Sequence, residues 1–299
     1  MRKKSYFHAG AWVLSALLGS AAAYAVENAV QQVIYPQSES EQDTRYDDLL
    51  ALLKTSLEIT VSEFGPFVLE PAARVMNESR YIHEVGKGEQ INVIWRSTSE
   101  KLERELLPIR IPLRKGLLGY RIFLIRKDDQ AKFSAIQSLD ELKKLSVGQG
   151  ASWGDVALFT ANHMPVVTGT SYEGLFQMLV AGRFDYFSRG VNEAYPEYEA
   201  RKDELPDLWV EEDLLLYYPW PYYFFVSPKH PELAERIRRG LEKMYKTGDF
   251  DRIFRQYHQA AIDRANLKQR RLFEIENPLL PAATPLQRKE LWYFPLDDE

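Results

Sequence analysis

The feature that most constrains the fold is an alternation of short apolar strands with helices, which occurs twice along the chain. The first run predicts strands at 32–35, 67–69 and 91–95. After a further strand at 120–125, the second run predicts strands at 145–149, 165–168 and 184–187. Strand–helix–strand units of this kind form parallel sheets. The sequence therefore predicts an α/β protein with two sheets, one in each of two lobes.

Helix signals place the intervening helices and two more near the end. The first helix is expected to begin at Asp43 or Thr44, and the patterns Ser138-x-x-Glu141 and Thr170-x-x-Glu173 predict capping boxes. After strands at 208–210 and 222–226, Pro231 opens a helix that stops at Gly248. Asp249 is expected to cap the last helix, whose buried face is predicted to hold Phe250, Ile253, Phe254 and Tyr257. Repeated prolines predict an extended surface tail over 278–299.

The first 25 residues have the pattern of an export signal. Arg2, Lys3 and Lys4 precede a charge-free stretch that ends in Ala23-Tyr24-Ala25, so cleavage is expected between Ala25 and Val26. An uncleaved anchor is the alternative, but the stretch of 17 residues is shorter than a span of about 20. A periplasmic protein that comprises residues 26–299 is the expected product.

Composition limits the classes of function. Without the leader, 35 basic residues face 43 acidic ones, which argues against a nucleic-acid-binding surface. The 45% apolar content excludes wholesale disorder. The chain has no cysteine, so it forms no disulfide and no thiolate metal site. No phosphate loop, dinucleotide fingerprint or metal-binding motif is present, so neither a cofactor nor a metal is expected.

Three segments, in order, resemble a known family. They are Ser97-Thr98-Ser99-Glu100 with Glu103-Arg104 and Leu107-Pro108-Ile109, then Glu173–Leu179 with Gly182–Asp185, and then Tyr222–Ser227 with Pro231-Glu232-Leu233 and Lys246–Ile253. Over 30–257 the chain resembles the type II periplasmic solute-binding proteins, the amino-acid-binding class that feeds ABC importers. The stretch 60–78 matches least.

This resemblance implies a two-lobed fold of the periplasmic-binding-protein type II, with two hinge crossings. Lobe one is expected to comprise 26–124 and 222–277, and lobe two 127–220. The implied function is capture of a small polar solute, an amino acid or another carboxylate, in the cleft between the lobes. The implied partner is an ABC permease or a membrane sensor, and the implied state is a monomer.

The ends of predicted strands and the starts of predicted helices indicate which residues are candidates for ligand binding. In α/β sheets, ligands lie at the carboxyl ends of strands, and helix N-termini there offer N–H groups to anions. Ser152 with Trp153, Thr170, and Arg189 all follow predicted lobe-two strands. Their glycine- and serine-rich surroundings are equally typical of ordinary turn and capping chemistry.

Further candidates come from the resemblance and from residue type. Arg104 is similar in position to the arginine with which the family holds a ligand carboxylate, and Arg96 is a rival, whereas an arginine in a charged run is commonly solvated. Glu193 is a candidate to meet a ligand ammonium, although acids in a first helical turn also serve the helix dipole. Trp95 and Trp153 are candidates to stack on the ligand, with core burial as the alternative.

Two enzymatic interpretations remain open. The run Gly150-Ala151-Ser152-Trp153-Gly154 matches the G-x-S-x-G pattern of a hydrolase nucleophile, with Asp185 and His258 following in the required order. Some relatives of the binding proteins are dehydratases, for which Glu193 or Glu173 is the candidate acid. No oxyanion-hole loop is recognisable for the first alternative.

Overall fold

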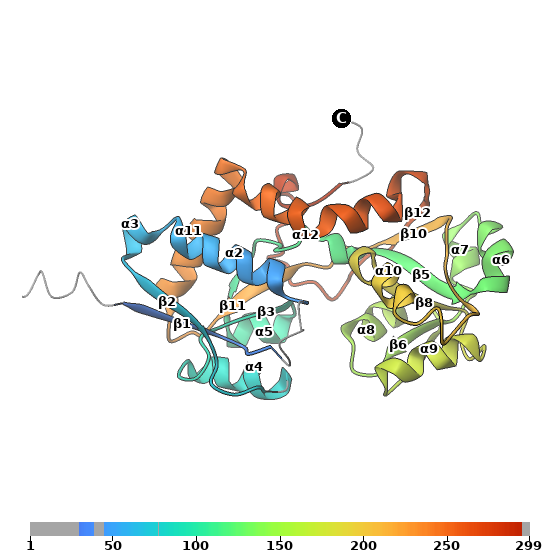
Figure 1. Ribbon diagram of the computed structural model, residues 1–299, viewed down its shortest axis with the longest axis horizontal. Coiled ribbons are helices and arrows are strands. Elements are labelled where there is room, and N and C mark those ends of the chain that lie inside the picture. Colours follow the sequence, from blue (N-terminus) through green and yellow to red (C-terminus); the bar gives the residue numbers. More distant parts are fainter. Residues whose placement is uncertain (1–29, 39–44, 77, 295–299) are drawn as a thin grey trace, which may run out of the picture.

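The computed structural model describes residues 30–38, 45–76 and 78–294, which form two lobes side by side (Figure 1). The predicted leader, its cleavage site between Ala25 and Val26, and the helix start at Asp43 or Thr44 lie outside the described residues. None of the helices in the described ranges combines the length and apolar character that a membrane crossing requires.

In the described ranges, lobe one contains five short strands in two hydrogen-bonded groups, so the prediction of a single parallel sheet for this lobe is wrong. The parallel pair is β1 (Gln31–Tyr35) and β2 (Phe67–Pro71), and the antiparallel group has the order β3 (Val93–Ser97), β11 (Tyr222–Val226), β4 (Leu107–Ile109). Asn92 joins the groups, because its Nδ2 donates to the Gln32 carbonyl at 2.8 Å and its Oδ1 accepts from the Ile34 N–H at 2.9 Å. The backbone N–H of Asn92 also donates to the Ile34 carbonyl at 3.0 Å, so Asn92 links β1 to the start of β3.

Helices cover both faces of the lobe-one strands. On one face, Trp95 and Phe224 share a core with α2 (Asp47–Glu58) and α11 (Pro231–Thr247). On the other, Ile94 and Phe225 pack with residues from α4 (Glu78–Lys87) and α5 (Glu100–Glu105). The short helix α3 (Val61–Phe64) follows α2. Neighbouring strand residues thus enter different cores, as the period of two in a strand requires.

The packing of α2 on α11 leaves no room for a side chain at Gly240. A Cβ built there would lie 2.2 Å from the Ser56 carbonyl oxygen. One turn earlier, Arg236 is fully buried and donates to the Leu57 carbonyl at 3.0 Å and the Gly65 carbonyl at 2.9 Å. Its guanidinium thus joins α11 to the last turn of α2, through Leu57, and to the end of α3, through Gly65.

Replacing Gly240 with alanine is expected to lower the free energy of unfolding by about 1–3 kcal/mol, because the helix backbones must separate to admit the methyl group. The measurement is a urea unfolding curve. Gly86→Ala is the matched control, since it lies within helix α4 and a Cβ there meets no heavy atom within 4 Å. That variant should be unchanged or more stable by up to about 1 kcal/mol. Equal stability of the two variants would contradict the close packing.

Lobe two is built on a single larger sheet. Its strand order is β12-β10-β5-β8-β6-β7, and β9 also pairs with β5. The strands β6, β7 and β8 are parallel, whereas β5 is antiparallel to β8, β9 and β10. The strand bounds are β5 (Tyr120–Arg126), β6 (Val147–Gly150), β7 (Val166–Gly169), β8 (Tyr186–Gly190), β9 (Leu208–Val210), β10 (Leu214–Tyr217) and β12 (Arg271–Glu274). The predicted parallel strands of the second run are confirmed.

Several short helices and one long one complete the chain. The α-helices are α6 (Gln130–Ser134), α7 (Leu139–Leu142), α8 (Gly154–Ala161), α9 (Tyr172–Val180), α10 (Val191–Glu199) and α12 (Asp249–Ala265). The 3-10 helices are η1 (Leu117–Gly119), η2 (Lys127–Asp129), η3 (Leu267–Gln269) and η4 (Lys289–Leu291).

The predicted helix details are partly confirmed. The capping box of Ser138 and Glu141 is present at α7. The capping box predicted at Thr170 is wrong, because Ser171 caps α9 instead and its side chain accepts from the N–H of Gly174 at 3.2 Å.

The last helix also differs in its cap and in its buried face. The N-cap of α12 is Gly248 in a left-handed conformation, rather than Asp249, which is the first helical residue. Tyr257 is 40% exposed, and His258 takes the buried place one position later. The buried stripe therefore continues from Phe254 by a step of four residues, which one helical turn allows as readily as a step of three.

The lobe boundaries differ from those expected. The strand β5, expected in lobe one as part of 26–124, pairs with β8, β9 and β10 in the lobe-two sheet. The strand β12, expected in lobe one as part of 222–277, lies parallel to β10 in lobe two. Apolar periodicity identifies a strand, but it does not say which sheet supplies its partners.

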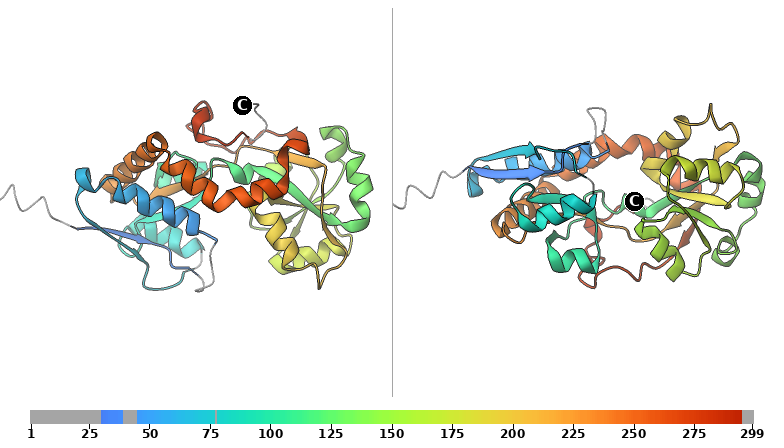
Figure 2. Two further views of the ribbon diagram at one scale, coloured as in Figure 1. Left: turned by 45° about the horizontal axis from the view of Figure 1, so that its top comes forward. Right: turned by 90° about the horizontal axis from the view of Figure 1, so that it is seen from below.

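The chain after β11 crosses between the lobes twice more. Helix α12 starts in the lobe-one core with Phe250 and reaches the lobe-two core with Ala265 (Figure 1). After β12 the C-terminal segment returns to lobe one, where Leu291 and Trp292 are buried (Figure 2). The tail predicted to lie on the surface is thus anchored in a core, because the prolines prevent helix formation without preventing burial of the apolar residues among them.

Candidate functional site

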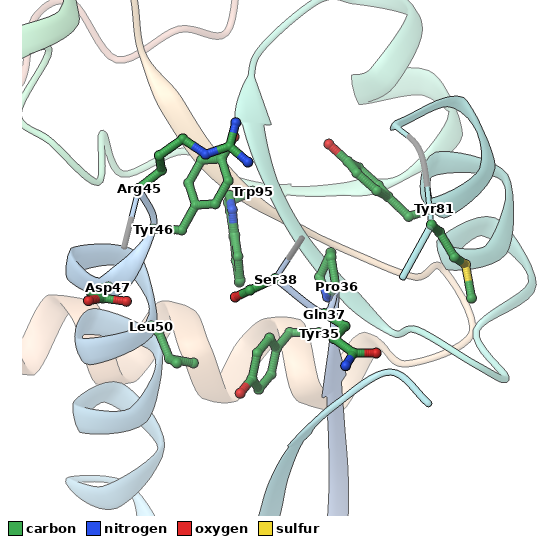
Figure 3. A pocket seen from close by; sticks show the side chains of 11 residues that line it. Tyr35, Pro36, Gln37, Ser38, Arg45, Tyr46, Asp47, Leu50, Tyr81 and Trp95 are labelled. Atoms are coloured by element: carbon green, nitrogen blue, oxygen red, sulfur yellow. The ribbon is translucent and has the colours of Figure 1, made fainter. Parts of the chain in front are cut away.

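A pocket of about 170 Å³ lies where β1 and β3 end and α2 begins (Figure 3). These are carboxyl ends of strands in lobe one, and in Figure 1 the start of α2 lies on the side of lobe one that faces lobe two. The lining residues are Tyr35, Pro36, Gln37, Ser38, Arg45, Tyr46, Asp47, Leu50, Met76, Tyr81 and Trp95. The pocket therefore occupies the position at which α/β sheets bind ligands.

Aromatic rings form one wall of this pocket. The centroid of the Trp95 ring lies 5.9 Å from that of Tyr35 and 5.7 Å from that of Tyr46. Trp95 is only 7% exposed, and the centroid of its ring lies 6.4 Å from that of Phe224 in an edge-on arrangement. Trp95 is thus both a core residue and a lining residue of the pocket, so the two alternatives considered for it are compatible.

Beside the pocket, a buried ion pair fixes the start of α2. Arg114 donates to Asp48 from Nε at 2.6 Å and from Nη2 at 2.8 Å, and its Nη2 also donates to the Arg45 carbonyl at 2.7 Å. His258 of α12 lies 3.0 Å from the same Asp48 carboxylate. Burial raises the pKa of Asp48, but the hydrogen bonds and charges of Arg114 and His258 outweigh it and hold the pKa well below its usual range.

The carboxyl ends of β6, β7 and β8 bring five of the predicted residues to one edge of lobe two. Ser152 and Thr170 are exposed in the turns after β6 and β7, whereas Arg189 is buried at the end of β8. The ring of Trp153 stacks on Phe187 with centroids 6.0 Å apart and carries the Arg189 guanidinium 5.0 Å from its centroid. Glu193 follows in the first turn of α10.

The charges at this edge are paired with one another. Arg189 donates to both carboxylate oxygens of Glu197, at 2.7 Å and 2.5 Å, and its Nη2 lies 3.3 Å from Glu193. Glu193 accepts from the Gly190 N–H at 2.8 Å. Burial raises the pKa of Glu193, but the charges of Arg189 and Arg121 and the Gly190 bond outweigh it, so the pKa is lowered. Glu193 is therefore held as a carboxylate.

A second group of buried polar side chains, formed by Arg121, Asp155 and Tyr218, lies next to Glu193. Arg121 donates to Asp155 at 2.6 Å and lies 3.7 Å from Glu193, and the Tyr218 hydroxyl donates to Asp155 at 2.6 Å. Asp155, Glu193 and Glu197 thus share two arginines, and Glu193 is the most exposed of these three carboxylates. This edge combines a half-exposed carboxylate with the exposed polar turns at Ser152 and Thr170.

The structure does not bring Arg104 to the pocket. Its side chain is 69% exposed on α5 and lies 3.8 Å from Glu100, so it belongs to a solvated charged face. Arg96 is half-buried on β3 next to Trp95, and its charge acts on the buried hydroxyl of Tyr222. Of the two arginines, only Arg96 therefore lies at the carboxyl end of a lobe-one strand.

The residues of the hydrolase pattern have other partners. Asp185 accepts from the Ser146 hydroxyl at 2.8 Å and from Lys132 at 2.6 Å, and His258 bonds Asp48. The exposed Ser152 also lacks the left-handed backbone of a strained nucleophile turn.

The second candidate acid for a dehydratase, Glu173, is held ionised as Glu193 is. Its hydrogen bond with Arg201 lowers its pKa. Within the described ranges, no group of three His, Cys, Asp or Glu side chains is placed to hold a metal ion.

Sequence reasoning missed most of the residues that line the pocket. Tyr35 is the last residue of a predicted strand, so the rule that ligands lie at strand ends could have found it. Arg45, Tyr46 and Tyr81 carry no comparable signal, because they reach the pocket only once α2 and α4 are packed beside β1 and β3. The pairing of Asp48 with Arg114 joins residues 66 positions apart.

No protein-family model and no curated protein matches the chain, whereas solved structures do. One is a Bacillus subtilis protein described as a probable amino-acid ABC transporter extracellular-binding protein, with a TM-score of 0.55, 12% identity, and coverage of 77% of this chain and 98% of that one. Another is an ancestral arginine-binding protein bound to arginine, with a TM-score of 0.50, 17% identity, and coverage of 77% and 99%. An ancestral arginine-binding protein bound to glutamine matches with a TM-score of 0.50 and 18% identity, and the match covers 76% of this chain and 97% of that one.

At these identities the likeness concerns the fold. The matched structures are covered almost completely, so the similarity extends over both lobes rather than one. The chain therefore has the two-lobed α/β fold of the type II amino-acid-binding periplasmic proteins.

Proposed function

We propose that this protein reversibly binds a small polar solute between its two lobes, for delivery to a membrane importer or for detection by a membrane sensor. The observation that carries the proposal is the aromatic pocket at the carboxyl ends of β1 and β3, on the side of lobe one that faces the polar edge of lobe two. The solute would occupy this pocket, and the turns at Ser152 and Thr170 and the carboxylate of Glu193 would close over it.

The structural neighbours support the same class of function. Solved structures with this fold have arginine or glutamine bound as a ligand, and one is described as a probable amino-acid ABC transporter extracellular-binding protein. The export signal predicted at the N-terminus agrees with a role outside the cytoplasm. An amino acid or another small carboxylate is therefore the class of solute that we expect.

Binding without catalysis is the favoured mode. A general acid needs a pKa raised toward the working pH, whereas Glu193 and Glu173 both have lowered pKa values. Hinge closure of the lobes would instead exclude water from the solute and strengthen its polar contacts.

The test is a thermal-shift screen of residues 26–299 against amino acids, small carboxylates, polyamines and sugars, after unfolding and refolding to remove carried-over ligand. A solute at 100 times its Kd adds about 2.7 kcal/mol, which should raise the Tm by about 5–10 °C. The bound compound should be recovered chemically unchanged. Absence of any shift would contradict the solute-binding proposal, and conversion of the compound would establish an enzyme instead.

A further inference from the structure

We infer that the C-terminal segment, residues 275–294, acts as a strap that restricts the two lobes to a narrow range of relative orientations. The segment follows β12 of lobe two and enters the core of lobe one near its end, so it passes between the lobes (Figure 2). It is attached to both lobes and to the crossings before β5 and before β11. The restraint acts whether or not a solute is bound, so it is separate from the proposed function.

The first part of the C-terminal segment is bound to lobe two and to the crossing before β11. Ile275 is buried in a lobe-two core. Asn162 of α8 donates from Nδ2 to the Glu276 carbonyl at 2.8 Å, and Asn277 donates from Nδ2 to the Pro219 carbonyl at 2.9 Å. A rotation of lobe two therefore carries this end of the segment with it.

The last part of the C-terminal segment is bound to lobe one. The Arg288 guanidinium donates to both carboxylate oxygens of Glu242 in α11, at 2.7 Å and 3.1 Å. Leu291 and Trp292 are buried in the lobe-one core, where they are 0% and 5% exposed. The Trp292 Nε1 donates to the Pro285 carbonyl at 3.0 Å, so the anchored region begins at Pro285. This end of the segment therefore moves with lobe one.

The same end holds the backbone of the crossing before β5. Lys115 and Gly116 in this crossing have positive φ angles of 49° and 71°. Hinge motions are absorbed by φ and ψ changes at a few residues of this kind of connection. The Tyr293 N–H donates to the Lys115 carbonyl at 2.8 Å, and the Trp292 ring fills the space next to Gly116, where a Cβ would lie 2.5 Å from it. A change of these dihedral angles must therefore displace the C-terminal segment.

The C-terminal segment has little slack between its two anchored ends. Its backbone forms successive turns, in which the N–H groups of Leu280, Thr284 and Arg288 donate to carbonyls three residues earlier at 3.3, 2.9 and 3.2 Å. Three prolines within the segment fix φ at their positions and make it a semi-rigid spacer. Lobes joined only by flexible crossings are expected to move relative to each other, and this spacer opposes such motion.

Double electron–electron resonance on residues 26–299 without added solute measures the restraint. The chain has no cysteine, so Lys54→Cys in α2 and Gln177→Cys in α9, both at exposed positions, place one spin label on each lobe. The pair Lys54→Cys and Lys101→Cys, with both labels on lobe one, supplies the width of a distance distribution without lobe motion. The distribution between the lobes should be about as narrow as this reference.

The variant that combines Asn277→Ala with Arg288→Ala removes one anchor from each end of the C-terminal segment. It should widen the distance distribution between the lobes about twofold or more. Arg238→Ala is the matched control, because it removes an arginine–glutamate pair, with Glu235, that lies entirely within α11. This control should leave the distribution unchanged. Circular dichroism verifies that each variant is folded, and Arg288→Gln alone replaces the combined variant if that protein does not fold.

Two results would overturn the inference. One is a folded variant, with weakened anchors, whose distribution between the lobes matches that of the unmodified segment. The other is an unmodified protein whose distribution between the lobes is about twice as wide as the reference within lobe one. Neither result depends on a solute, so failure of the solute screen and failure of this inference are distinguishable.

Discussion

Replacing Asp48 with alanine is expected to lower the free energy of unfolding by about 3–5 kcal/mol. The substitution leaves Arg114, which is 7% exposed, without the carboxylate that accepts two of its hydrogen bonds. A buried charge that loses its partner keeps the full cost of its removal from water. The segment that contains Arg114 leads into the first crossing, so the start of α2 and this crossing should both loosen.

Urea unfolding at neutral pH measures this loss. Asp47→Ala is the matched control, because Asp47 is the exposed neighbour in the same helical turn and should cost less than about 1 kcal/mol. The pKa of Asp48 is lower in the folded protein than the value of about 3.9 in an unfolded chain, so its contribution is complete above pH about 4 and decreases as the pH falls below that. The difference between the two proteins should shrink on acidification. A loss below 1 kcal/mol at neutral pH would show that the pair does not stabilise the fold.

Replacing Trp292 with alanine is expected to cost about 3–5 kcal/mol, which is the range for truncating a buried tryptophan. Its ring lies against Gly116, where a Cβ would be 2.5 Å from the ring carbon Cε3, and its Nε1 donates to the Pro285 carbonyl at 3.0 Å. Next to it, the Tyr293 N–H donates to the Lys115 carbonyl at 2.8 Å. Loss of the ring should release the C-terminal segment from lobe one.

Unfolding curves together with limited proteolysis test this prediction. The substitution Leu286→Ala provides a control in the same segment, because Leu286 is 44% exposed and its removal should change stability by less than about 0.5 kcal/mol. Trp292→Ala should also make the chain after β12 the first site of cleavage. A stable, protease-resistant Trp292→Ala protein would show that the segment contributes little to lobe one.

Asp48→Ala and Trp292→Ala both affect the segment that leads from lobe one into β5. The Arg114 carbonyl accepts from the Leu117 N–H just before β5, and the Tyr120 hydroxyl of β5 donates to the Tyr293 carbonyl at 2.8 Å. Asn277 donates to the Pro219 carbonyl at 2.9 Å at the other crossing. The C-terminal segment therefore contacts the crossing before β5 and the crossing before β11, and release of this segment should make motion of the lobes easier.

Part of the site was predictable from local rules, and part was not. The positions of Trp153, Arg189 and Glu193 follow from the strand-end rule once β6 and β8 are predicted as parallel strands. Arg104 shows the limit of this reasoning, because a position within a charged helix does not reveal which side of the helix faces a neighbour. In the structure Arg104 is exposed to solvent, and Arg45 lines the pocket instead.

The sequence by itself determined the local elements and the class of fold. Alternating apolar residues, capping serines and glycines act within a few positions of one another, so they specify most of the strands and the parallel order of β6 with β7 and β8 without knowledge of distant contacts. They did not predict the strands β4, β10 and β12. The tertiary structure alone decided which sheet received β5 and β12, where the tail was buried, and which charges paired. These outcomes depend on contacts between residues far apart in sequence, such as Asp48 with His258 and Gly116 with Trp292, and no local pattern encodes such contacts.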